Sequence, residues 1–177
     1  TDPNHSSAYN NLGLVFQAFG EFQKARSCYE KAIQLNSNHA DMHNNLANVL
    51  RELGELQKAR SSYQKAIEIQ PNFAHAHNNL GIIFKQLGEN RKAINCFQKT
   101  IQINPNYENA HNNLGVVFNE LGEDQKAIGY FQKAIQINPN YASAHNNLGA
   151  IFMQLGKLQK AKSCLQKAIQ IRPNYSE

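Results

Sequence analysis

Apolar and polar positions along the chain follow the 3.6-residue period of an α-helix. One stripe of such a helix, with the spacing i, i+4, i+8, i+11, contains Ala76, Leu80, Phe84 and Leu87. Gly88 interrupts this stripe, and a second apolar stripe follows over Ala93–Ile103. It ends before Pro105, because proline cannot continue a helix. The pattern therefore predicts two helices, joined by a short glycine turn and followed by a short proline turn.

The same pattern returns every 34 residues. The turn glycine recurs at Gly20, Gly54, Gly88, Gly122 and Gly156. A leucine eight residues before each of these glycines recurs at Leu12, Leu46, Leu80, Leu114 and Leu148. A fixed period of this length indicates stacked repeats, each burying its apolar face against its neighbours. We predict one array over residues 1–177, a fragment of a longer chain, with ten helices in five repeats: 6–39, 40–73, 74–107, 108–141 and 142–175. Residues 1–5 would be the tail of a preceding repeat.

Within each repeat, small, aromatic and proline residues stand at fixed positions. Each repeat has Leu then Gly or Ala at positions seven and eight, Gly at fifteen, Ala at twenty and, in four repeats, an aromatic residue at twenty-four. From Ser6 to Tyr175 this pattern resembles the tetratricopeptide repeat (TPR) family. The resemblance implies an all-α fold, a right-handed α-solenoid of five helix-turn-helix repeats. First helices would line a concave groove, and second helices would form the convex back.

Two adjacent asparagines recur in every first helix. The sixth-position column is Asn11, Asn45, Asn79, Asn113 and Asn147, and the fifth-position column is Asn10, Asn44, Asn78, Asn112 and Asn146. At about 100° per residue, the fifth and sixth positions lie roughly 160° and 260° from the leucine of the buried stripe. Both columns are therefore predicted to face solvent, which in a TPR stack means the groove.

A carboxamide offers both a hydrogen-bond acceptor and donors, so it can pair with a peptide unit without reading any side chain. With first helices roughly 10 Å apart, one asparagine would meet about every third residue of an extended peptide. The sixth-position column is similar to the asparagine ladder of O-GlcNAc transferase and to the asparagines of importin-α that hold a bound chain. We therefore predict a protein-interaction module whose partner is a protein or extended peptide. Two simpler interpretations stay open, in which the asparagines only make the groove soluble or bond an adjacent helix.

Charge narrows the kind of partner. The chain has 18 Lys and Arg against 13 Asp and Glu, for a net charge of +5. Most basic residues are predicted on second helices, whereas the groove charges nearly cancel, so we expect no nucleic acid in the groove. The second and sixth positions carry no Lys or Arg, which argues against the basic clamp that holds acidic C-termini in other TPR proteins. Weak, salt-sensitive contact with nucleic acid through the convex side stays open.

Candidate chemistry is sparse. The fourth-position histidines, roughly 10 Å apart, are too far from one another to share a metal ion, and we expect them to be packing residues: His43, His77, His111 and His145. The three cysteines, at two-repeat intervals, cannot form disulfides with one another and suit a reducing compartment, which favours the cytoplasm: Cys28, Cys96 and Cys164. No nucleophile–base arrangement or phosphate loop is present, so we predict no enzyme, no metal site and no cofactor.

Two other roles stay open at this stage. The array could be the substrate-recruiting arm of a larger enzyme, such as a glycosyltransferase, whose catalytic domain lies outside these residues. It could also be a self-assembling scaffold, because it ends in apolar residues at Ile169, Ile171 and Tyr175 without a polar capping helix. No apolar run approaches the roughly 20 residues that span a bilayer, and no signal peptide precedes the first repeat, so no membrane association is expected.

Overall fold

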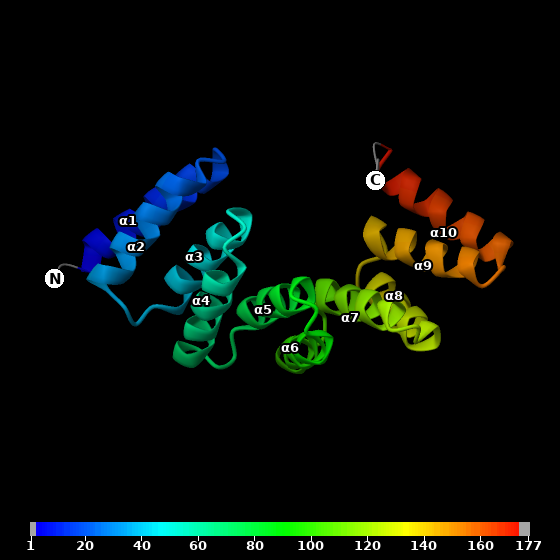
Figure 1. Cartoon of the computed structure of the whole chain (residues 1–177). Helices are drawn as coiled ribbons and strands as arrows, with labels where there is room; N and C mark the ends of the chain where they lie inside the picture. Colours follow the sequence, from blue (N-terminus) through cyan, green and yellow to red (C-terminus); the bar gives the residue numbers. More distant parts are fainter. Residues whose placement is uncertain (1–2, 174–177) are drawn as a thin grey trace. The chain divides into compact units, whose positions relative to one another are not determined.

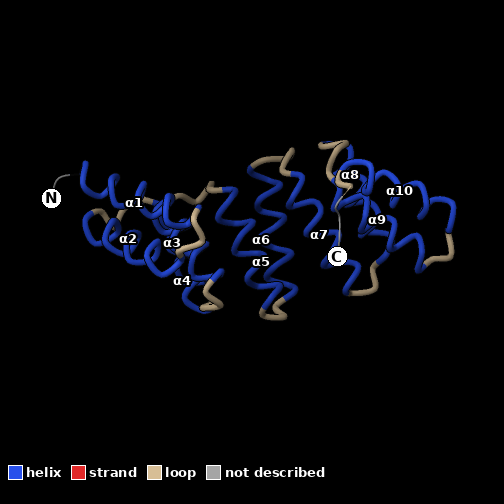
Figure 2. The backbone as a smooth tube through the Cα atoms, turned by 90° about the horizontal axis from the view of Figure 1, so that it is seen from above, coloured by secondary structure: helices blue, strands red, loops and turns tan. Residues whose placement is uncertain are grey.

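A computed structural model describes residues 3–173, which form ten α-helices and no β-strand (Figure 1, Figure 2). The helices are α1 (Pro3–Ala18), α2 (Phe22–Leu35), α3 (Ala40–Glu52), α4 (Leu56–Ile69), α5 (Ala74–Gln86), α6 (Asn90–Ile103), α7 (Glu108–Glu120), α8 (Asp124–Ile137), α9 (Ala142–Gln154) and α10 (Leu158–Ile171). The all-α class and the five helix-turn-helix repeats predicted from the sequence are confirmed. Tyr175, part of the predicted apolar end, lies outside the described residues.

The repeat boundaries coincide with the starts of helices. The predicted first positions of repeats two to five are the first residues of α3, α5, α7 and α9: Ala40, Ala74, Glu108 and Ala142. The first repeat differs, because α1 begins at Pro3 and not at Ser6. Residues 3–5 are therefore helical and continue directly into the first helix of the repeat that begins at Ser6. Proline suits the first turn of a helix, where its missing N–H would have no intrahelical partner.

The chain divides into two compact units, residues 1–89 and 90–177. The first unit contains α1 to α5, in which α2 packs on both α1 and α3, and α4 on both α3 and α5. The second contains α6 to α10, where α8 likewise packs on α7 and α9, while α10 packs on α9 and α6 on α7. Within a unit, the first helices of successive repeats also contact each other. In the first unit α3 contacts both α1 and α5, and in the second unit α7 contacts α9.

Each glycine turn ends a first helix in the same way. Gly20 has a φ of 73°, a left-handed conformation that side chains disfavour. Its N–H donates to Gln17 O at 3.0 Å, and the Glu21 N–H donates to Phe16 O at 2.9 Å. This pair of bonds is a Schellman motif, which satisfies carbonyls at the helix end. The motif recurs at the other four turn glycines, which explains why glycine returns every 34 residues.

Each helix pair closes around one large side chain at position twenty-four. Tyr29 and Tyr63 are fully buried in the first unit, and Phe131 is nearly so in the second. A Cβ atom on Gly13 would lie 2.6 Å from the Tyr29 ring, and one on Gly115 would lie 2.5 Å from the Phe131 ring. Position eight is small because this ring occupies the space that a side chain would need.

Candidate functional site

The recurrent asparagines hydrogen-bond across successive first helices. In the first unit, Asn45 Nδ2 on α3 donates to Asn10 Oδ1 on α1 at 3.1 Å. In the second unit, Asn147 Nδ2 on α9 donates to Asn112 Oδ1 on α7 at 3.0 Å. The two asparagine columns, predicted as two independent edges of one face, are thus joined in these repeats. The sixth-position amide of one repeat binds the fifth-position amide of the repeat before it.

The junction between α3 and α5 is bonded differently. Here Asn79 Nδ2 donates to Asn48 Oδ1 at 3.1 Å, and the Tyr63 hydroxyl donates to the same oxygen at 2.6 Å. Asn79 Oδ1 in turn accepts a hydrogen bond from Asn78 Nδ2 at 3.3 Å. Asn44 Oδ1 is consequently left buried with no hydrogen-bond partner among the described residues. Sequence reasoning missed Asn48, although it is the only asparagine at the ninth position of any repeat.

The two columns differ in exposure. The fifth-position side chains of the middle repeats are buried, with exposed fractions of 8% for Asn44, 4% for Asn78 and 7% for Asn112. The prediction that they face solvent is wrong, because a calculation on a single helix omits the neighbouring first helix that packs alongside. The remaining fifth-position residues, Asn10 and Asn146, are half-buried. The sixth-position side chains keep more access, since Asn11 is exposed and the others are half-buried: Asn45, Asn79, Asn113 and Asn147.

Several sixth-position amides keep unused hydrogen-bonding capacity. A carboxamide has two N–H donors and two lone pairs on its oxygen. Asn45 and Asn147 each use one N–H, and no described residue bonds to the other N–H or to the oxygen. Asn11 makes no side-chain hydrogen bond within residues 3–173. Each of these side chains can therefore accept a hydrogen bond from the N–H of a peptide unit and donate one to its C=O.

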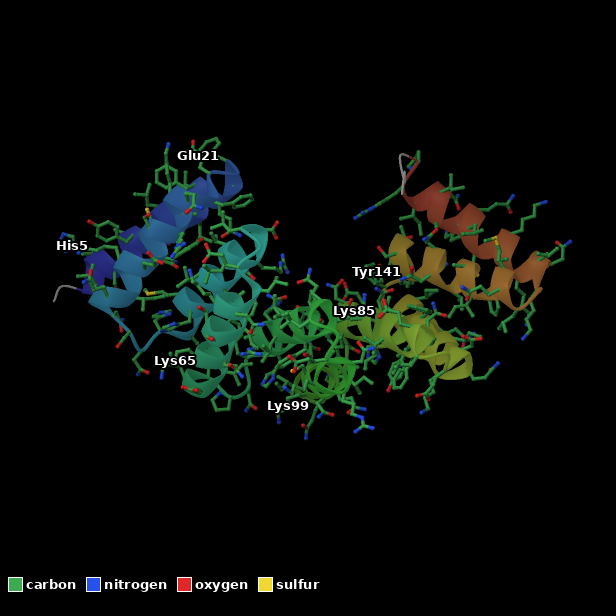
Figure 3. All side chains as sticks on the ribbon, viewed as in Figure 1. His5, Glu21, Lys65, Lys85, Lys99 and Tyr141 are labelled. Carbon is green, nitrogen blue, oxygen red and sulfur yellow. The ribbon has the colours of Figure 1, made fainter. Side chains whose placement is uncertain are left out.

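The polar surroundings of these amides vary along the chain. On α3, Arg51 is paired with Glu52 at 2.7 Å, so their charges offset one another. Tyr141, labelled in Figure 3, donates its hydroxyl to Asn109 Oδ1 at 2.5 Å within the fourth repeat, in the second unit. The prediction that most basic residues lie on second helices is confirmed by the helix bounds. Two first helices also carry large exposed apolar side chains, Leu14 on α1 and Met153 on α9.

The fourth-position histidines fasten the loops between repeats, in line with the predicted packing role. Each ring places Nε2 within 2.9–3.0 Å of the carbonyl oxygen six residues earlier, at Ser37, Pro71, Pro105 or Pro139. Because a carbonyl only accepts hydrogen bonds, Nε2 carries the proton in this contact. Burial lowers the pKa of His111, whose Nδ1 has no partner among the described residues.

The cysteines are unpaired thiols, and burial is the main cause that raises the pKa of each: Cys28, Cys96 and Cys164. A raised pKa disfavours the reactive thiolate, so these side chains are poor nucleophiles. Among the described residues, no group of three His, Cys, Asp or Glu side chains is placed to hold a metal ion. In the same part of the chain, no helix combines the length and hydrophobicity that a membrane span requires.

Comparison with known families identifies the repeats. A family model described as "TPR repeat" matches residues 47–88, 83–122 and 117–156, and models described as "Tetratricopeptide repeat" match residues 6–39, 28–61 and 142–175. The chain belongs to the tetratricopeptide repeat family. TPR arrays are in general non-catalytic protein-interaction modules, and this chain has the fold of that class. Among the curated protein sequences, none matches it.

Solved structures of TPR proteins share this fold. MamA is 26% identical, with a TM-score of 0.79 over 91% of this chain and 94% of its own. The pilF protein of Pseudomonas aeruginosa is 24% identical, with a TM-score of 0.88 over 94% of this chain and 76% of its own. YrrB, described as a TPR protein with an unusual peptide-binding site, is 24% identical, with a TM-score of 0.71 over 94% and 86%. The predicted TPR membership therefore stands on both sequence and fold.

Proposed function

We propose that this TPR array binds an extended peptide by its main chain, through the sixth-position asparagines of the first helices. The residues are Asn11, Asn45, Asn79, Asn113 and Asn147. The proposal rests on the hydrogen bonding of Asn45 and Asn147. Each side-chain amide donates one N–H to a neighbouring repeat, and its second N–H and its carbonyl oxygen remain available to a ligand. A peptide unit supplies the complementary C=O and N–H, so each amide can form a two-bond pair with it.

In this proposal the fifth-position asparagines are positioning residues. Asn10 and Asn112 accept one N–H from the following repeat's sixth-position amide, which fixes the rotation of that carboxamide. A side chain held in one orientation loses less conformational freedom when a ligand binds. We propose this positioning role for Asn10 and Asn112, and for Asn78, which donates to Asn79 Oδ1, without contact between these residues and the peptide. No such bond involves the other two fifth-position residues, Asn44 and Asn146, within the described residues.

The spacing of the amides sets the length of peptide that each unit would hold. Packed helices lie roughly 10 Å apart, and an extended chain advances roughly 3.3 Å per residue. Three first helices in the first unit therefore match about six residues of extended peptide. The first helices also carry the exposed apolar side chains Leu14 and Met153, with which apolar side chains of the peptide could pack.

The test uses peptides selected from a random 12-residue phage-displayed library against the 177-residue chain, with affinity measured by calorimetry. The double substitution Asn45→Ala and Asn79→Ala should weaken binding by at least tenfold, because two amide–peptide pairs of about 1 kcal/mol per hydrogen bond are lost. N-methylation of alternate peptide units should weaken it similarly, because methylation removes the N–H that the asparagine oxygen accepts.

Asn10→Ala is the matched control. It removes the same inter-repeat hydrogen bond that Asn45→Ala removes, yet it keeps the Asn45 amide that is proposed to contact the peptide. Its affinity should fall by no more than about threefold, because only the fixed orientation of Asn45 is lost while the Asn45 amide itself is kept, which separates peptide contact from loss of stability. Unchanged affinity of the double variant, or equal tolerance of methylated and unmethylated peptides, would refute main-chain binding.

A further inference from the structure

The second helices of the second unit carry an excess of positive charge. In α6, α8 and α10 the acidic Asp124 is outnumbered by basic residues, which are Arg91, Lys92, Lys99, Lys126, Lys133, Lys160, Lys162 and Lys167. The first helices of this unit have the opposite balance, since α7 and α9 contain Glu108 and Glu120 and no lysine or arginine. The two kinds of helix therefore suit partners of different charge.

Lysine recurs at position twenty-six of the repeat with a neutral partner in this unit. Lys99, Lys133 and Lys167 each donate to the glutamine three residues later, at 3.1–3.2 Å. A glutamine oxygen accepts one of the three ammonium N–H groups and leaves the positive charge uncompensated. No described carboxylate forms an ion pair with any of the three lysines. Each of them can therefore still bind an anion.

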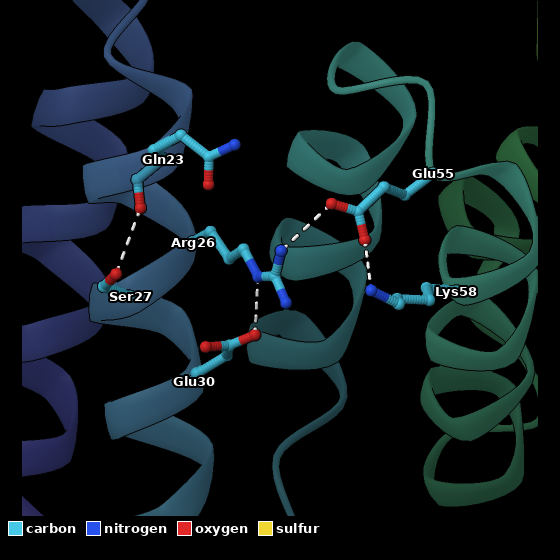
Figure 4. Close-up of polar contacts among 6 residues, drawn as sticks. All are labelled: Gln23, Arg26, Ser27, Glu30, Glu55 and Lys58. Atoms are coloured by element: carbon cyan, nitrogen blue, oxygen red, sulfur yellow. Dashed lines mark hydrogen bonds and ion pairs between the residues drawn. The ribbon is translucent and has the colours of Figure 1, made fainter.

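Carboxylates offset several basic residues of the first unit. Arg26 Nη1 on α2 lies 3.0 Å from Glu55 Oε1, and Lys58 Nζ lies 2.6 Å from the other oxygen of Glu55 (Figure 4). At position twenty-six of the second repeat, Lys65 pairs with Glu68 at 3.0 Å. The same repeat position thus has a paired lysine on α4 and an uncompensated one on α8.

An aromatic ring lies between two lysines on α8. Tyr130 follows Lys126 by four residues and precedes Lys133 by three, so the three side chains share one side of the helix. The Tyr130 ring is half-buried and stacks on Phe118 of α7, with centroids 5.4 Å apart and an angle of 3° between the planes. The centroid of the His111 ring lies 6.2 Å from that of Tyr130. Tyr130 is therefore held in place while part of its ring reaches solvent.

This side of α8 stays open although helices pack on α8 from two directions. Lys126 and Lys133 are exposed even though both α7 and α9 contact α8. The two lysines are seven residues apart, which is about 10 Å along the helix axis. At about 3.4 Å per stacked nucleotide, this distance corresponds to about three nucleotides. An aromatic residue at position twenty-three occurs in the fourth repeat alone, since the other repeats have Cys28, Ser62, Cys96 and Cys164.

We propose that this side of the second unit binds single-stranded nucleic acid, with one base stacked on Tyr130 and phosphates on Lys99, Lys133 and Lys167. Proteins bind single strands with basic side chains along the backbone and aromatic rings on which bases stack, with little dependence on sequence. Both elements occur together on α8. An acidic peptide or an anionic membrane would use the lysines and gain nothing from the ring. The site lies on second helices, so it is additional to the proposed peptide site on the first helices.

Fluorescence anisotropy with a labelled 12-nucleotide thymidylate strand and the 177-residue chain tests the proposal. Affinity should fall about 20-fold between 50 and 200 mM salt, because three phosphate contacts give a slope of about −2. Lys133→Gln should lower that slope by about 0.7 and weaken binding about three- to tenfold at 50 mM salt. Lys65→Gln is the matched control: it removes the same charge at the same repeat position, from a lysine paired with Glu68, and should leave binding unchanged.

Two substitutions at Tyr130 test the stacked base. Tyr130→Ser should weaken binding about 5- to 150-fold without changing the salt slope, because the stacking of one base is lost. Tyr130→Phe keeps the ring and should bind within about twofold of the unsubstituted chain. An abasic strand has the same phosphates, so it should bind the Tyr130→Ser variant and the unsubstituted chain equally, a result that misfolding of the variant would not give. Circular dichroism checks that each variant keeps its helices.

Four results would overturn the proposal. The first is no binding of the thymidylate strand at 50 mM salt. The second is equal weakening by Lys65→Gln and Lys133→Gln, which would indicate a response to net charge alone. The third is unchanged affinity of Tyr130→Ser for thymidylate. The fourth is tighter binding to a polyglutamate peptide or to phosphatidylserine vesicles than to the thymidylate strand. Asn45→Ala combined with Asn79→Ala should leave thymidylate binding unchanged, so the two proposed sites are tested separately.

Discussion

The buried, unpaired oxygen of Asn44 permits a sharp test of the hydrogen bonds between repeats. Asn44 and Asn112 occupy the same fifth position of different repeats, with exposed fractions of 8% and 7%. Asn112 Oδ1 accepts a hydrogen bond from Asn147, whereas Asn44 Oδ1 has no partner among the described residues. Replacing each with alanine removes the same atoms from similarly buried sites. The two substitutions therefore differ mainly in the hydrogen bond.

The expected effects have opposite signs. Asn44→Ala removes a buried, unsatisfied oxygen, which costs about 1–3 kcal/mol of stability in the native chain. Asn112→Ala removes a formed hydrogen bond, with a net loss of about 1 kcal/mol. Both changes gain up to about 0.7 kcal/mol of helix propensity, which cancels in the comparison. Asn44→Ala should thus be the more stable variant, by about 2–4 kcal/mol.

Urea unfolding followed by far-UV circular dichroism measures the difference in free energy of unfolding between the two variants. Because repeat arrays need not unfold in one step, native-state hydrogen exchange of the amides in α3 and α7 measures the local stability as well. Asn146→Ala is the control, since this fifth-position side chain is half-buried and makes no side-chain hydrogen bond within residues 3–173. It should show the propensity gain alone. Equal stability changes for Asn44→Ala and Asn112→Ala would refute the reasoning.

Three further predictions address packing, pH and thiol chemistry. Gly129→Ala should stabilise the chain by about 0.5–1 kcal/mol, because its Cβ meets no atom within 4 Å, whereas Gly115→Ala should cost about 1–3 kcal/mol against Phe131; thermal melts measure both. Because burial lowers the pKa of His111 below its ordinary 6.5, the unfolded chain takes up a proton first as pH falls. Stability should therefore be fully present above about pH 6.5 and decrease below it, and urea titrations should show a weaker decrease in His111→Gln. Since burial raises the pKa of Cys96 to about 11, iodoacetamide should alkylate it about 100-fold more slowly than a thiol of pKa 9.0, as followed by mass spectrometry.

The sequence predicted what depends on a single repeat. The turn glycines follow from the left-handed backbone that ends each first helix, and position eight follows from the ring that fills its space. The repeat starts at Ala40, Ala74, Glu108 and Ala142 also follow from the 34-residue period. Each of these features is set by local geometry, which recurs wherever the motif recurs.

What the sequence could not predict depends on the distance between helices. Asn44 and Asn112 are oriented away from the leucine stripe on an isolated helix, yet the neighbouring first helices bury them. The hydrogen bond from Asn45 to Asn10 requires both side chains in one register, which the period alone does not determine. Asn79 binds Asn48 instead, because the second repeat alone has an asparagine at the ninth position.

The histidine that fastens each inter-repeat loop has a consequence for how such a protein can grow. The bond from the imidazole of His77 or His145 spans six residues and lies across a repeat boundary. A gene duplication of one full 34-residue period would copy both partners in register. The new repeat boundary would therefore contain its own hydrogen bond between imidazole and carbonyl. An insertion or deletion inside the loop would separate imidazole from carbonyl, so we expect inherited changes of array length to come in whole periods.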